Sequence, residues 1–340
     1  MQQVAVVILN WNGCELLRSF LPSVVQYSQA DGAVVYVADN GSTDASRELL
    51  SREFPTVRLI ALERNYGFAE GYNRALEQVD ATYAVLLNSD VEVTPHWLVP
   101  LHSYMEAHPR AAACQPKLLS RHRRNYFEYA GAAGGYLDCY GYPFCRGRIL
   151  QTVEEDRGQY DGAASPLLWA TGAALFIRLS DYRSAGGLDA RFFAHMEEID
   201  LCWRLRSRGH IVACVPQSTV YHLGAATLRK EHPRKTFLNF RNNLLMLYKN
   251  LPEAELKPVL RMRALLDGAA LLLFLLKGQG KNAQAVWQAR REFRALRSVY
   301  ADVRAENLRQ TTVCHPPERT RFSILLGYYL LGKRRFTQYF

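Results

Sequence analysis

Short apolar runs alternate with helix-like segments along the first hundred residues of the chain. The apolar runs, which are rich in β-branched residues, cover residues 4–9, 33–38, 57–62 and 83–87. Helical patterns follow three of them, at residues 15–26, up to Glu53, and within 65–79. This alternation predicts a parallel sheet built from βαβ units. Polar loops that follow parallel strands meet at one edge of the sheet, so the first third predicts a nucleotide-binding platform.

The pattern changes twice after this first third. Residues 103–165 are less regular, and the Gly-, Tyr- and Cys-rich segment 131–147 predicts loops or a short hairpin. We then expect a strand over 167–178, a helix from about Glu197, and a strand over 211–221 that ends at His222. Amphipathic helices are predicted at 237–251, 256–276 and 282–299, separated by Pro252, Pro258 and the break at Gly278 and Gly280.

The composition of the chain predicts an anionic partner. The chain has 340 residues, which exceeds the roughly 150 of one average domain, and its net charge is +10. Such a charge suits nucleotide phosphates, an acidic lipid surface or nucleic acid. The basic residues gather late, at Arg229 and Lys230, Arg234 and Lys235, Arg261 and Arg263, Arg290 and Arg291, and residues 333–335.

Cysteine usage and the apolar runs predict a cytoplasmic location. The seven cysteines form no CxxC pair and are odd in number, which favours reduced thiols over a disulfide framework. Residues 1–3 lead directly into an apolar strand, without the basic region of a signal peptide. The longest apolar run, 268–276, is well short of the ~20 residues that span a bilayer. We expect a protein that is soluble or bound to a membrane surface.

Polar residues follow the predicted strand 83–87 in a compact cluster that contains Asn88, Asp90 and Glu92. A carboxylate at the end of a buried parallel strand can hold Mg²⁺ or Mn²⁺ against a diphosphate, because these ions favour oxygen ligands. The alternative is a plain exit from the strand, where Asn, Ser and Asp are favoured anyway.

Two further clusters follow other predicted strands. Residues 39–44 (DNGSTD) offer a carboxylate that can accept a hydrogen bond from a base, and the alternative is an ordinary helix cap at Ser42 or Thr43. Residues 64–73 form a glycine-spaced loop before a helix, which either approaches a pyrophosphate or makes a plain turn.

A fourth cluster places Glu197, Glu198 and Asp200 in one helical turn. Crowded carboxylates raise one another's pKa, which suits a general base. The alternative for Asp200 is a surface ion pair with Arg204, four residues later. That alternative leaves Glu197 and Glu198 unexplained.

The order of these motifs resembles the inverting GT-A type glycosyltransferases of family 2, and especially their bacterial rhamnosyltransferase-like branch. The resemblance extends over about residues 4–230 and rests on residues 7–13 (VILNWNG), 39–44, 64–69 with Asn73, 87–90 (LNSD), 172–173 with 187–189, and 197–204. It implies an α/β GT-A fold, with a Rossmann-like, mostly parallel sheet flanked by helices. We expect a glycosyltransferase domain at 1–232, whose nucleotide-binding half is 1–100 and whose acceptor and catalytic half is 101–232. A basic helical region follows at 233–340.

The resemblance also implies roles for individual residues. Asp39 accepts a hydrogen bond from a pyrimidine ring, Asp90 and His222 bind a metal ion at the diphosphate, and Glu198 is the catalytic base. A structural histidine is the alternative for His222. The candidates for catalysis are Glu197, Glu198 and Asp200, and those for binding the acceptor are Trp169 and Gly172. The candidates for binding the nucleotide-sugar are Asn10, Trp11, Asn12, Asp39, Asn40, Ser42, Asn65, Gly67, Phe68, Asn73, Asn88 and Ser89. The chain departs from the family pattern at Asn88, where the first Asp of D-x-D is expected, and at Glu198, where the base is usually Asp.

These assignments predict inverting transfer from a nucleoside-diphosphate-sugar to a hydroxyl of a saccharide or lipid-linked saccharide, in cell-surface polysaccharide synthesis. The donor expected is dTDP-rhamnose-like or a UDP-hexose, and the cofactor a divalent metal, Mg²⁺ or Mn²⁺. A catalytically degenerate nucleotide-sugar-binding or assembly scaffold is the alternative. The basic tail suits attachment to an anionic inner membrane leaflet, or is the solvated face of a helical subdomain. No nucleic-acid module is recognised, so no nucleic-acid partner is expected.

Overall fold

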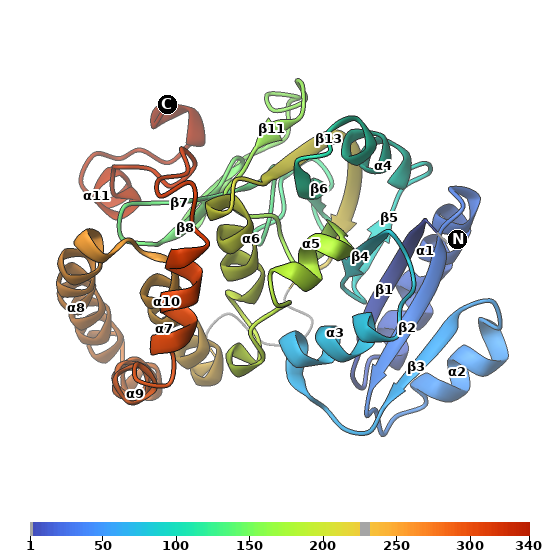
Figure 1. Ribbon diagram of the computed structural model, residues 1–340, viewed down its shortest axis with the longest axis horizontal. Helices are drawn as coiled ribbons and strands as arrows, with labels where there is room; N and C mark the ends of the chain where they lie inside the picture. Colours follow the sequence, from blue (N-terminus) through green and yellow to red (C-terminus); the bar gives the residue numbers. More distant parts are fainter. Residues whose placement is uncertain (1–2, 225–231) are drawn as a thin grey trace.

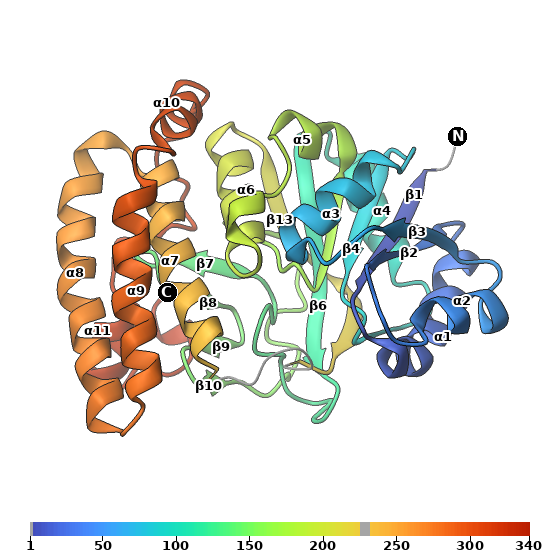
Figure 2. The same ribbon diagram turned by 90° about the horizontal axis from the view of Figure 1, so that it is seen from below.

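A nine-stranded sheet runs through the centre of the molecule, with helices on both of its faces (Figure 1). The computed structural model describes residues 3–224 and 232–340. The predicted basic pair Arg229 and Lys230 lies outside the described residues. Helices from the last third of the chain form a layer at one end of the sheet, opposite the end that carries the N-terminal strands (Figure 2).

The first third contains the predicted alternation of strands and helices. Its elements are β1 (Val4–Asn10), α1 (Cys14–Ala30), β2 (Val34–Asn40), α2 (Ser46–Glu53), β3 (Arg58–Leu62), α3 (Gly67–Glu77) and β4 (Tyr83–Leu87). The order β4-β1-β2-β3 is parallel throughout, which confirms the predicted βαβ units. Asn10 of β1 pairs with Asp39 of β2, so the polar ends of these strands meet at one sheet edge.

The middle of the chain completes the sheet and makes it mixed. Its elements are β5 (Val91–Val93), α4 (Leu98–Ala107), β6 (Ala111–Ser120), β11 (Ser165–Pro166), β12 (Ala174–Arg178), α5 (Leu179–Ser184), η1 (Ala190–Phe192), α6 (Glu197–Ser207) and β13 (Ile211–His222). The full order is β11-β13-β6-β12-β4-β1-β2-β3, and β5 pairs with β13. Strand β12 runs antiparallel to both of its neighbours.

The strand predicted over 167–178 is confirmed only at its end, where β12 covers Ala174–Arg178, and residues 167–173 lie outside the strands. Strand β11 pairs with β13, whereas β12 pairs with β4 and β6. Residues 167–173 therefore carry the chain across β13 and β6, from the position of β11 to that of β12. The intervening residues include Gly172, whose place near the candidate site depends on this crossing.

A second, four-stranded antiparallel sheet lies beside the first. Its strands are β7 (Gly135–Leu137), β8 (Pro143–Cys145), β9 (Arg148–Ile149) and β10 (Thr152–Val153). The antiparallel pair β7 and β8 confirms the short hairpin predicted within 131–147. Trp169 packs against this sheet where Gly135 has no side chain, and a Cβ there would lie 2.0 Å from the indole ring.

The last third is helical, as predicted. Its elements are α7 (Pro233–Asn250), α8 (Glu253–Leu276), α9 (Gly280–Leu296), α10 (Ala301–Arg309), α11 (Ile324–Tyr329) and η2 (Phe336–Gln338). The helix break predicted at Pro258 is wrong, because this exposed proline lies inside α8. Its ring removes the N–H that residue 258 would donate to the carbonyl of residue 254, so α8 loses one hydrogen bond in its second turn. Among the residues described, no helix combines the length and apolarity needed to cross a membrane.

Candidate functional site

The ends of β1 and β2 form one hydrogen-bonded cluster. Asn10 Nδ2 lies 3.4 Å from Asp39 Oδ1 and 3.3 Å from Ser42 Oγ. Asp39 is fully buried, and its Oδ2 accepts from the Arg47 guanidinium at 2.6 Å and from the Ser42 backbone N–H at 3.2 Å. Trp11 follows Asn10 in the chain and is 51% exposed, so part of its aromatic ring is available for stacking.

The side chain of Asn40 forms hydrogen bonds with the loop from Arg64 to Gly67. Asn40 Nδ2 donates to Gly67 O at 3.0 Å and to Asn65 Oδ1 at 3.2 Å, while its Oδ1 accepts from the Tyr66 N–H at 3.0 Å. Asn65 Oδ1 also accepts from the Gly67 N–H at 2.8 Å. These contacts occupy both Nδ2 and Oδ1 of Asn40. The Asn40 side chain therefore positions the loop and is not free for the predicted contact with the nucleotide-sugar.

Asn12 and Asn73, which were also predicted to contact the nucleotide-sugar, form hydrogen bonds within the protein. Asn12 Oδ1 accepts from the Thr43 N–H at 2.8 Å, which joins the first two loops of the edge. Asn73 Nδ2 donates to Leu188 O at 2.8 Å and its Oδ1 accepts from the Leu188 N–H at 3.0 Å and from the Tyr182 hydroxyl. Asn73 therefore ties α3 to the turn at residues 186–189, and the structure does not present it to a ligand.

Asp90 and His222 lie side by side because β5 pairs with the end of β13, where Val91 is opposite His222. His222 Nε2 is 3.0 Å from Asp90 Oδ1 and 3.4 Å from Asn88 Nδ2. On the other side of the ring, Nδ1 is 3.4 Å from Glu128 Oε1. Burial lowers the pKa of His222, but the carboxylates of Asp90 and Glu128 outweigh it and raise the pKa to about 10.

Asp90 and His222 are the two candidate metal ligands, and Glu128 is a neighbour that the sequence pattern did not reveal. A carboxylate behind the second ring nitrogen is the usual partner of a metal-binding histidine, because it fixes the ring orientation. Across residues 3–224 and 232–340, no three His, Cys, Asp or Glu side chains form a ready-made metal site. Ligand atoms beyond these two must therefore come from elsewhere, such as a substrate diphosphate.

The segment between η1 and α6 has an unusual backbone. Phe193, His195 and Met196 have positive φ angles of 63°, 72° and 73°. Such angles cost of order 1–3 kcal/mol for a non-glycine residue and persist only where the surroundings impose them. We call residues 192–196 the base loop, since they lead directly into Glu197 and Glu198.

Two helices impose the shape of the base loop. From α3, the N–H groups of Phe68 and Ala69 donate to Phe193 O at 2.7 and 3.2 Å. From α7, Asn242 Nδ2 lies 2.9 Å from Phe192 O, 2.9 Å from Ala194 O and 2.8 Å from His195 O. The fully buried Asn242 side chain thus contacts three carbonyls of one loop.

Glu197 and Glu198 differ in exposure. Glu197 is buried, and burial together with the charge of Glu198 raises its pKa well above the ordinary value. Glu198 is partly exposed, and burial of its carboxylate raises its pKa to about 7 although backbone amides, including that of Gly172, oppose the shift. Within the described part of the chain, Oε2 of each has no hydrogen-bond partner. Glu198 is therefore the more exposed of the two carboxylates.

Asp200 has a different environment, which corrects the surface ion pair expected for it. Its side chain is fully buried and contacts Arg204 Nε at 3.0 Å, Lys249 Nζ at 2.8 Å and Asn250 Nδ2 at 2.8 Å. Burial raises the pKa of Asp200, but Lys249 and Arg204 outweigh it, so the pKa is lowered overall. A carboxylate held by three donors is positioned for structure and is a poor candidate for a catalytic group.

The two acceptor candidates are separated by the structure. Gly172 lies between Phe68 and Glu198, since a Cβ on it would be 3.3 Å from the Phe68 ring and 3.7 Å from the Glu198 Cβ. Trp169 is only 2% exposed, and its indole N–H donates to Tyr136 O at 2.9 Å. The prediction for Trp169 is therefore wrong, because its ring fills the space over Gly135.

Comparisons with known proteins identify the class. Residues 5–139 match the family model described as glycosyl transferase family 2. An N-acetylglucosaminyl-diphospho-decaprenol L-rhamnosyltransferase of Mycobacterium tuberculosis (strain CDC 1551 / Oshkosh) is 27% identical over 231 residues, which cover 64% of this chain and 75% of that protein. The rhamnosyltransferase WbbL of Escherichia coli (strain K12) is 25% identical over 164 residues, covering 46% of this chain and 61% of that protein.

A solved structure gives the same fold. The crystal structure of GalNAc-T7 with UDP, GalNAc and Mn²⁺ superposes with a TM-score of 0.58 at 14% identity, covering 74% of this chain and 49% of that one. The mostly parallel sheet and its flanking helices have the GT-A fold. The protein is a glycosyltransferase whose residues 5–139 match glycosyl transferase family 2, and it is similar to rhamnosyltransferases. The fold and the enzyme class predicted from the sequence are confirmed.

Proposed function

We propose that this glycosyltransferase takes its sugar from a nucleoside-diphosphate donor and transfers it, with inversion, to a hydroxyl of a saccharide or lipid-linked saccharide. One observation carries the proposal, namely the meeting of two elements at Gly172. The Asn88 N–H at the end of β4 donates to Ala173 O at 3.0 Å, and the Glu198 side chain packs on the other side of Gly172. The donor-side strand end and the candidate base therefore flank the same short segment.

In the proposed reaction, Glu198 takes the proton from the acceptor hydroxyl. The hydroxyl oxygen then attacks the anomeric carbon from the face opposite the diphosphate, and the bond from that carbon to the diphosphate breaks. A pKa of about 7 suits this work, because the carboxylate is both ionised and basic near neutral pH. The strained base loop fixes the position of Glu198 before the acceptor arrives, which lowers the entropic cost of reaction.

Donor contacts are proposed for the strand-end cluster. Trp11 supplies an exposed face for stacking on the base, and the buried polar groups of Asn10 and Asp39 lie beside it. The Arg47 contact leaves Asp39 one oxygen that faces Asn10 alone. Resemblance to the rhamnosyltransferases supports a dTDP-activated deoxysugar, with UDP-hexoses as the other donor class.

A divalent metal is proposed at Asp90 and His222. These side chains fit Mg²⁺ or Mn²⁺, because one carboxylate and one imidazole, backed by Glu128, leave room for diphosphate oxygens in the coordination shell. The relative crystallised with UDP and Mn²⁺ supports this choice. When bound, the ion would neutralise charge on the departing nucleoside diphosphate. The amide of Asn88 adds a neutral group at the position where the D-x-D pattern of the family has its first carboxylate.

Contact with an anionic membrane surface is proposed for the end of α8. Leu272, Leu275 and Leu276 are 60%, 52% and 84% exposed there, and Lys277 and Lys281 follow within a few residues. Exposed leucines beside cations are the combination that binds an acidic lipid surface. Sedimentation with anionic vesicles, and not with neutral ones, is the expected result.

A scaffold that binds nucleotide-sugars without catalysis is the competing function. The environment of Glu198 argues against it, since a carboxylate whose Oε2 is buried without a hydrogen-bond partner destabilises the fold and has no use in a scaffold. Thermal-shift measurements with UDP, dTDP, GDP and CDP, each with and without Mn²⁺, test the donor site. We expect a metal-dependent rise in Tm with UDP or dTDP. A folded sample that responds to none of the four nucleotides would favour the scaffold.

A further inference from the structure

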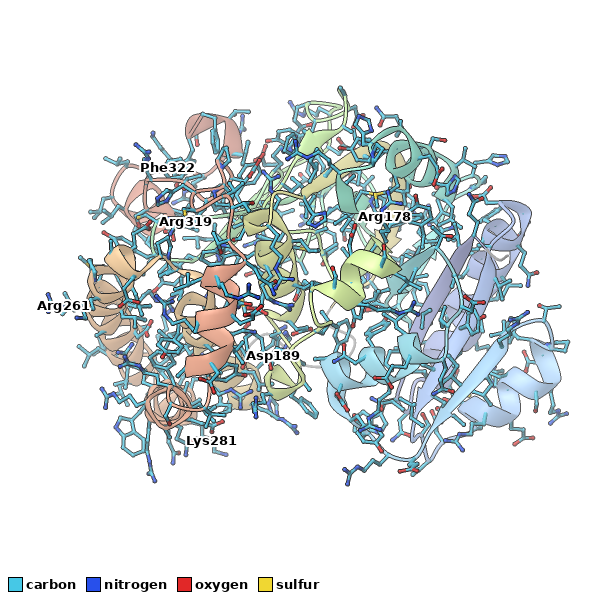
Figure 3. All side chains as sticks on the ribbon, viewed as in Figure 1. Arg178, Asp189, Arg261, Lys281, Arg319 and Phe322 are labelled. Carbon is cyan, nitrogen blue, oxygen red and sulfur yellow. The ribbon has the colours of Figure 1, made fainter. Side chains whose placement is uncertain are left out.

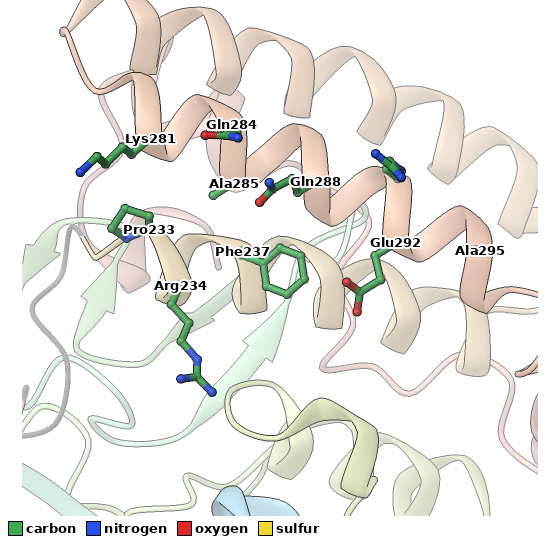
Figure 4. Close-up of a pocket in the computed structure, with 10 residues that line it drawn as sticks. Pro233, Arg234, Phe237, Lys281, Gln284, Ala285, Gln288, Glu292 and Ala295 are labelled. Atoms are coloured by element: carbon green, nitrogen blue, oxygen red, sulfur yellow. The ribbon is translucent and has the colours of Figure 1, made fainter.

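A groove of about 800 Å³ lies between α7 and α9, on the helical side of the base loop (Figure 4). Phe237 of α7 and Gln288 of α9 point into it, and Ala285 and Ala295 leave space along its α9 wall. A groove of this size can hold a substantial part of a small ligand.

The groove carries an excess of positive charge. Arg234, Lys281 and Arg291 line it, and its single carboxylate is Glu292. Glu292 is already neutralised, because it accepts from Arg241 Nη1 at 2.7 Å. The three remaining cations therefore favour an anionic ligand.

Both helices contribute their positive ends to the same end of the groove. Thr236 near the start of α7 donates to Asn282 near the start of α9 at 2.8 Å, and Arg241 meets Glu292 further along both helices. The helices are therefore parallel, and the partial positive charges of their N-termini add to Arg234 and Lys281. Lys281, in the first turn of α9, lies at the edge of the molecule (Figure 3). It is close in sequence to the exposed Leu275 and Leu276.

The same groove borders the base loop. The Arg234 guanidinium lies 4.7 Å from the centre of the Phe193 ring and points from α7 toward the segment before α6 (Figure 4). Phe193 is five residues before Glu198. The end of the groove formed by the N-termini of α7 and α9 therefore lies next to the base loop, through Arg234, and near the candidate membrane contact, through Lys281.

We propose that the groove between α7 and α9 binds the phosphate-bearing segment of a lipid-linked acceptor, with Arg234 and Lys281 contacting the phosphate and Phe237 contacting the adjoining lipid chain. This inference rests on the proposed function, because it supposes that the acceptor hydroxyl reaches Glu198. It assigns the acceptor to the class of saccharides joined through phosphate to an apolar carrier. Phosphate contacts from two cations would hold the carrier while the sugar extends past Phe193.

Titration calorimetry on the full chain tests the proposal, with the donor site first saturated with Mn²⁺ and the nucleotide that binds. The probes are farnesyl diphosphate, inorganic diphosphate and farnesol. The test variant is Arg234→Gln with Lys281→Gln, and the charge-matched control is Lys257→Gln with Arg261→Gln on the exposed surface of α8. We expect farnesyl diphosphate to bind the wild type and the control alike. The test variant should lose affinity by about tenfold or more, because it lacks two charged contacts.

The three probes separate the possible outcomes. Equal affinity of the test variant and the control for farnesyl diphosphate would overturn the groove as the site. Binding of farnesol as tight as farnesyl diphosphate would overturn the role of the cations. Inorganic diphosphate that binds as tightly as farnesyl diphosphate would identify free phosphate, and would overturn the lipid-linked assignment. Failure of nucleotides to bind would instead count against the donor site, and the farnesyl diphosphate titration can still be made without them.

Discussion

Glu198 combines partial exposure with a carboxylate oxygen that has no protein partner. Its pKa of about 7 follows mainly from burial, and the backbone amides of the helix start reduce the shift. The nearby ionisable groups are Glu197 in the same turn and the thiols of Cys145 and Cys202. All three stay protonated near neutral pH, because burial raises their pKa values. The ionisation of Glu198 therefore determines when this site can accept a proton.

This assignment predicts a rising pH–activity profile. As a base, Glu198 acts only when ionised, so kcat/KM should increase with pH about a midpoint near 7. Glu198→Gln should lower kcat by roughly 10²- to 10⁴-fold, because the proton acceptor is removed. Nucleotide affinity, measured in parallel, should not change. Near-normal turnover of Glu198→Gln, together with inactivity of Glu197→Gln, would transfer the role to Glu197.

The stability of the same variant checks the pKa independently of activity. A carboxyl group with a raised pKa in the folded state binds protons more tightly there than in the unfolded chain, where the pKa of Glu is about 4.3. Stability should therefore fall as the pH rises from about 4 to 7. Glu198→Gln should lack this part of the decrease, so its Tm should exceed that of the wild type at pH 8 but not at pH 4. Equal differences at both pH values would contradict a raised pKa.

At the scale of elements, local patterns were sufficient for the strands that pair with their neighbours in sequence. Runs of β-branched residues closed by polar loops predicted β1 to β4, and parallel pairing then brought Asn10 and Asp39 together. The pattern over 167–178 was right only for 174–178, because residues 167–173 are apolar and buried like a strand but carry the chain from β11 to β12 without pairing as one. Glu128 lies in an irregular segment with no local signal. The pairing of β13 with β5 and with β6 brings His222 into place between Glu128 and Asp90.

The base loop allows a prediction about α7. Asn242→Asp keeps the size of the side chain but removes its donor, so a carboxylate would face three backbone carbonyls. A loop shifted by about 1 Å can cost around 10²-fold in rate, so we expect kcat to fall by about that factor. The midpoint of the pH profile should move as well, because the surroundings of Glu198 change. Asn239→Asp, on a partly exposed position of the same helix, is the control.

A purely structural role for Asn242 would give a different result. In that case Asn242→Asp would lower the Tm while the folded fraction kept the wild-type kcat and pH midpoint. Measuring the rate per folded molecule, by active-site titration with the nucleotide that binds, distinguishes loss of fold from loss of position. An unchanged pH midpoint in a folded, active variant would contradict the positioning role.

At the scale of the molecule, charges join the helical region to the remainder of the chain. Lys249 Nζ of α7 contacts Asp189 Oδ2 at 2.6 Å and Asp200 Oδ2 at 2.8 Å. Asp189 lies between the helical region and the segments around α6 (Figure 3). Tyr300, just before α10, also donates to Asp189, at 3.1 Å. The boundary expected at residue 232 follows the change in composition, yet these contacts cross it. Sequence patterns treat Lys249 as part of a solvated basic face because its partners are about 50 residues away.

We therefore propose that the catalytic unit extends through α7, and Lys249→Met tests this. The substitution keeps the length and apolar stem of the side chain but leaves the fully buried Asp200 with Arg204 and Asn250 alone. Removing one partner of a buried ion pair costs about 3–5 kcal/mol, so the free energy of unfolding in urea should fall by that amount. Lys257→Met, at an exposed position of α8, should change it by less than about 0.5 kcal/mol.

The loss of stability caused by Lys249→Met should shrink at low pH. The pKa of Asp200 is lowered in the folded protein, and the ion pair contributes only while Asp200 is ionised. If residues 1–232 alone unfolded with the midpoint of the whole chain, the catalytic unit would end before α7 and this account of Lys249 would be wrong.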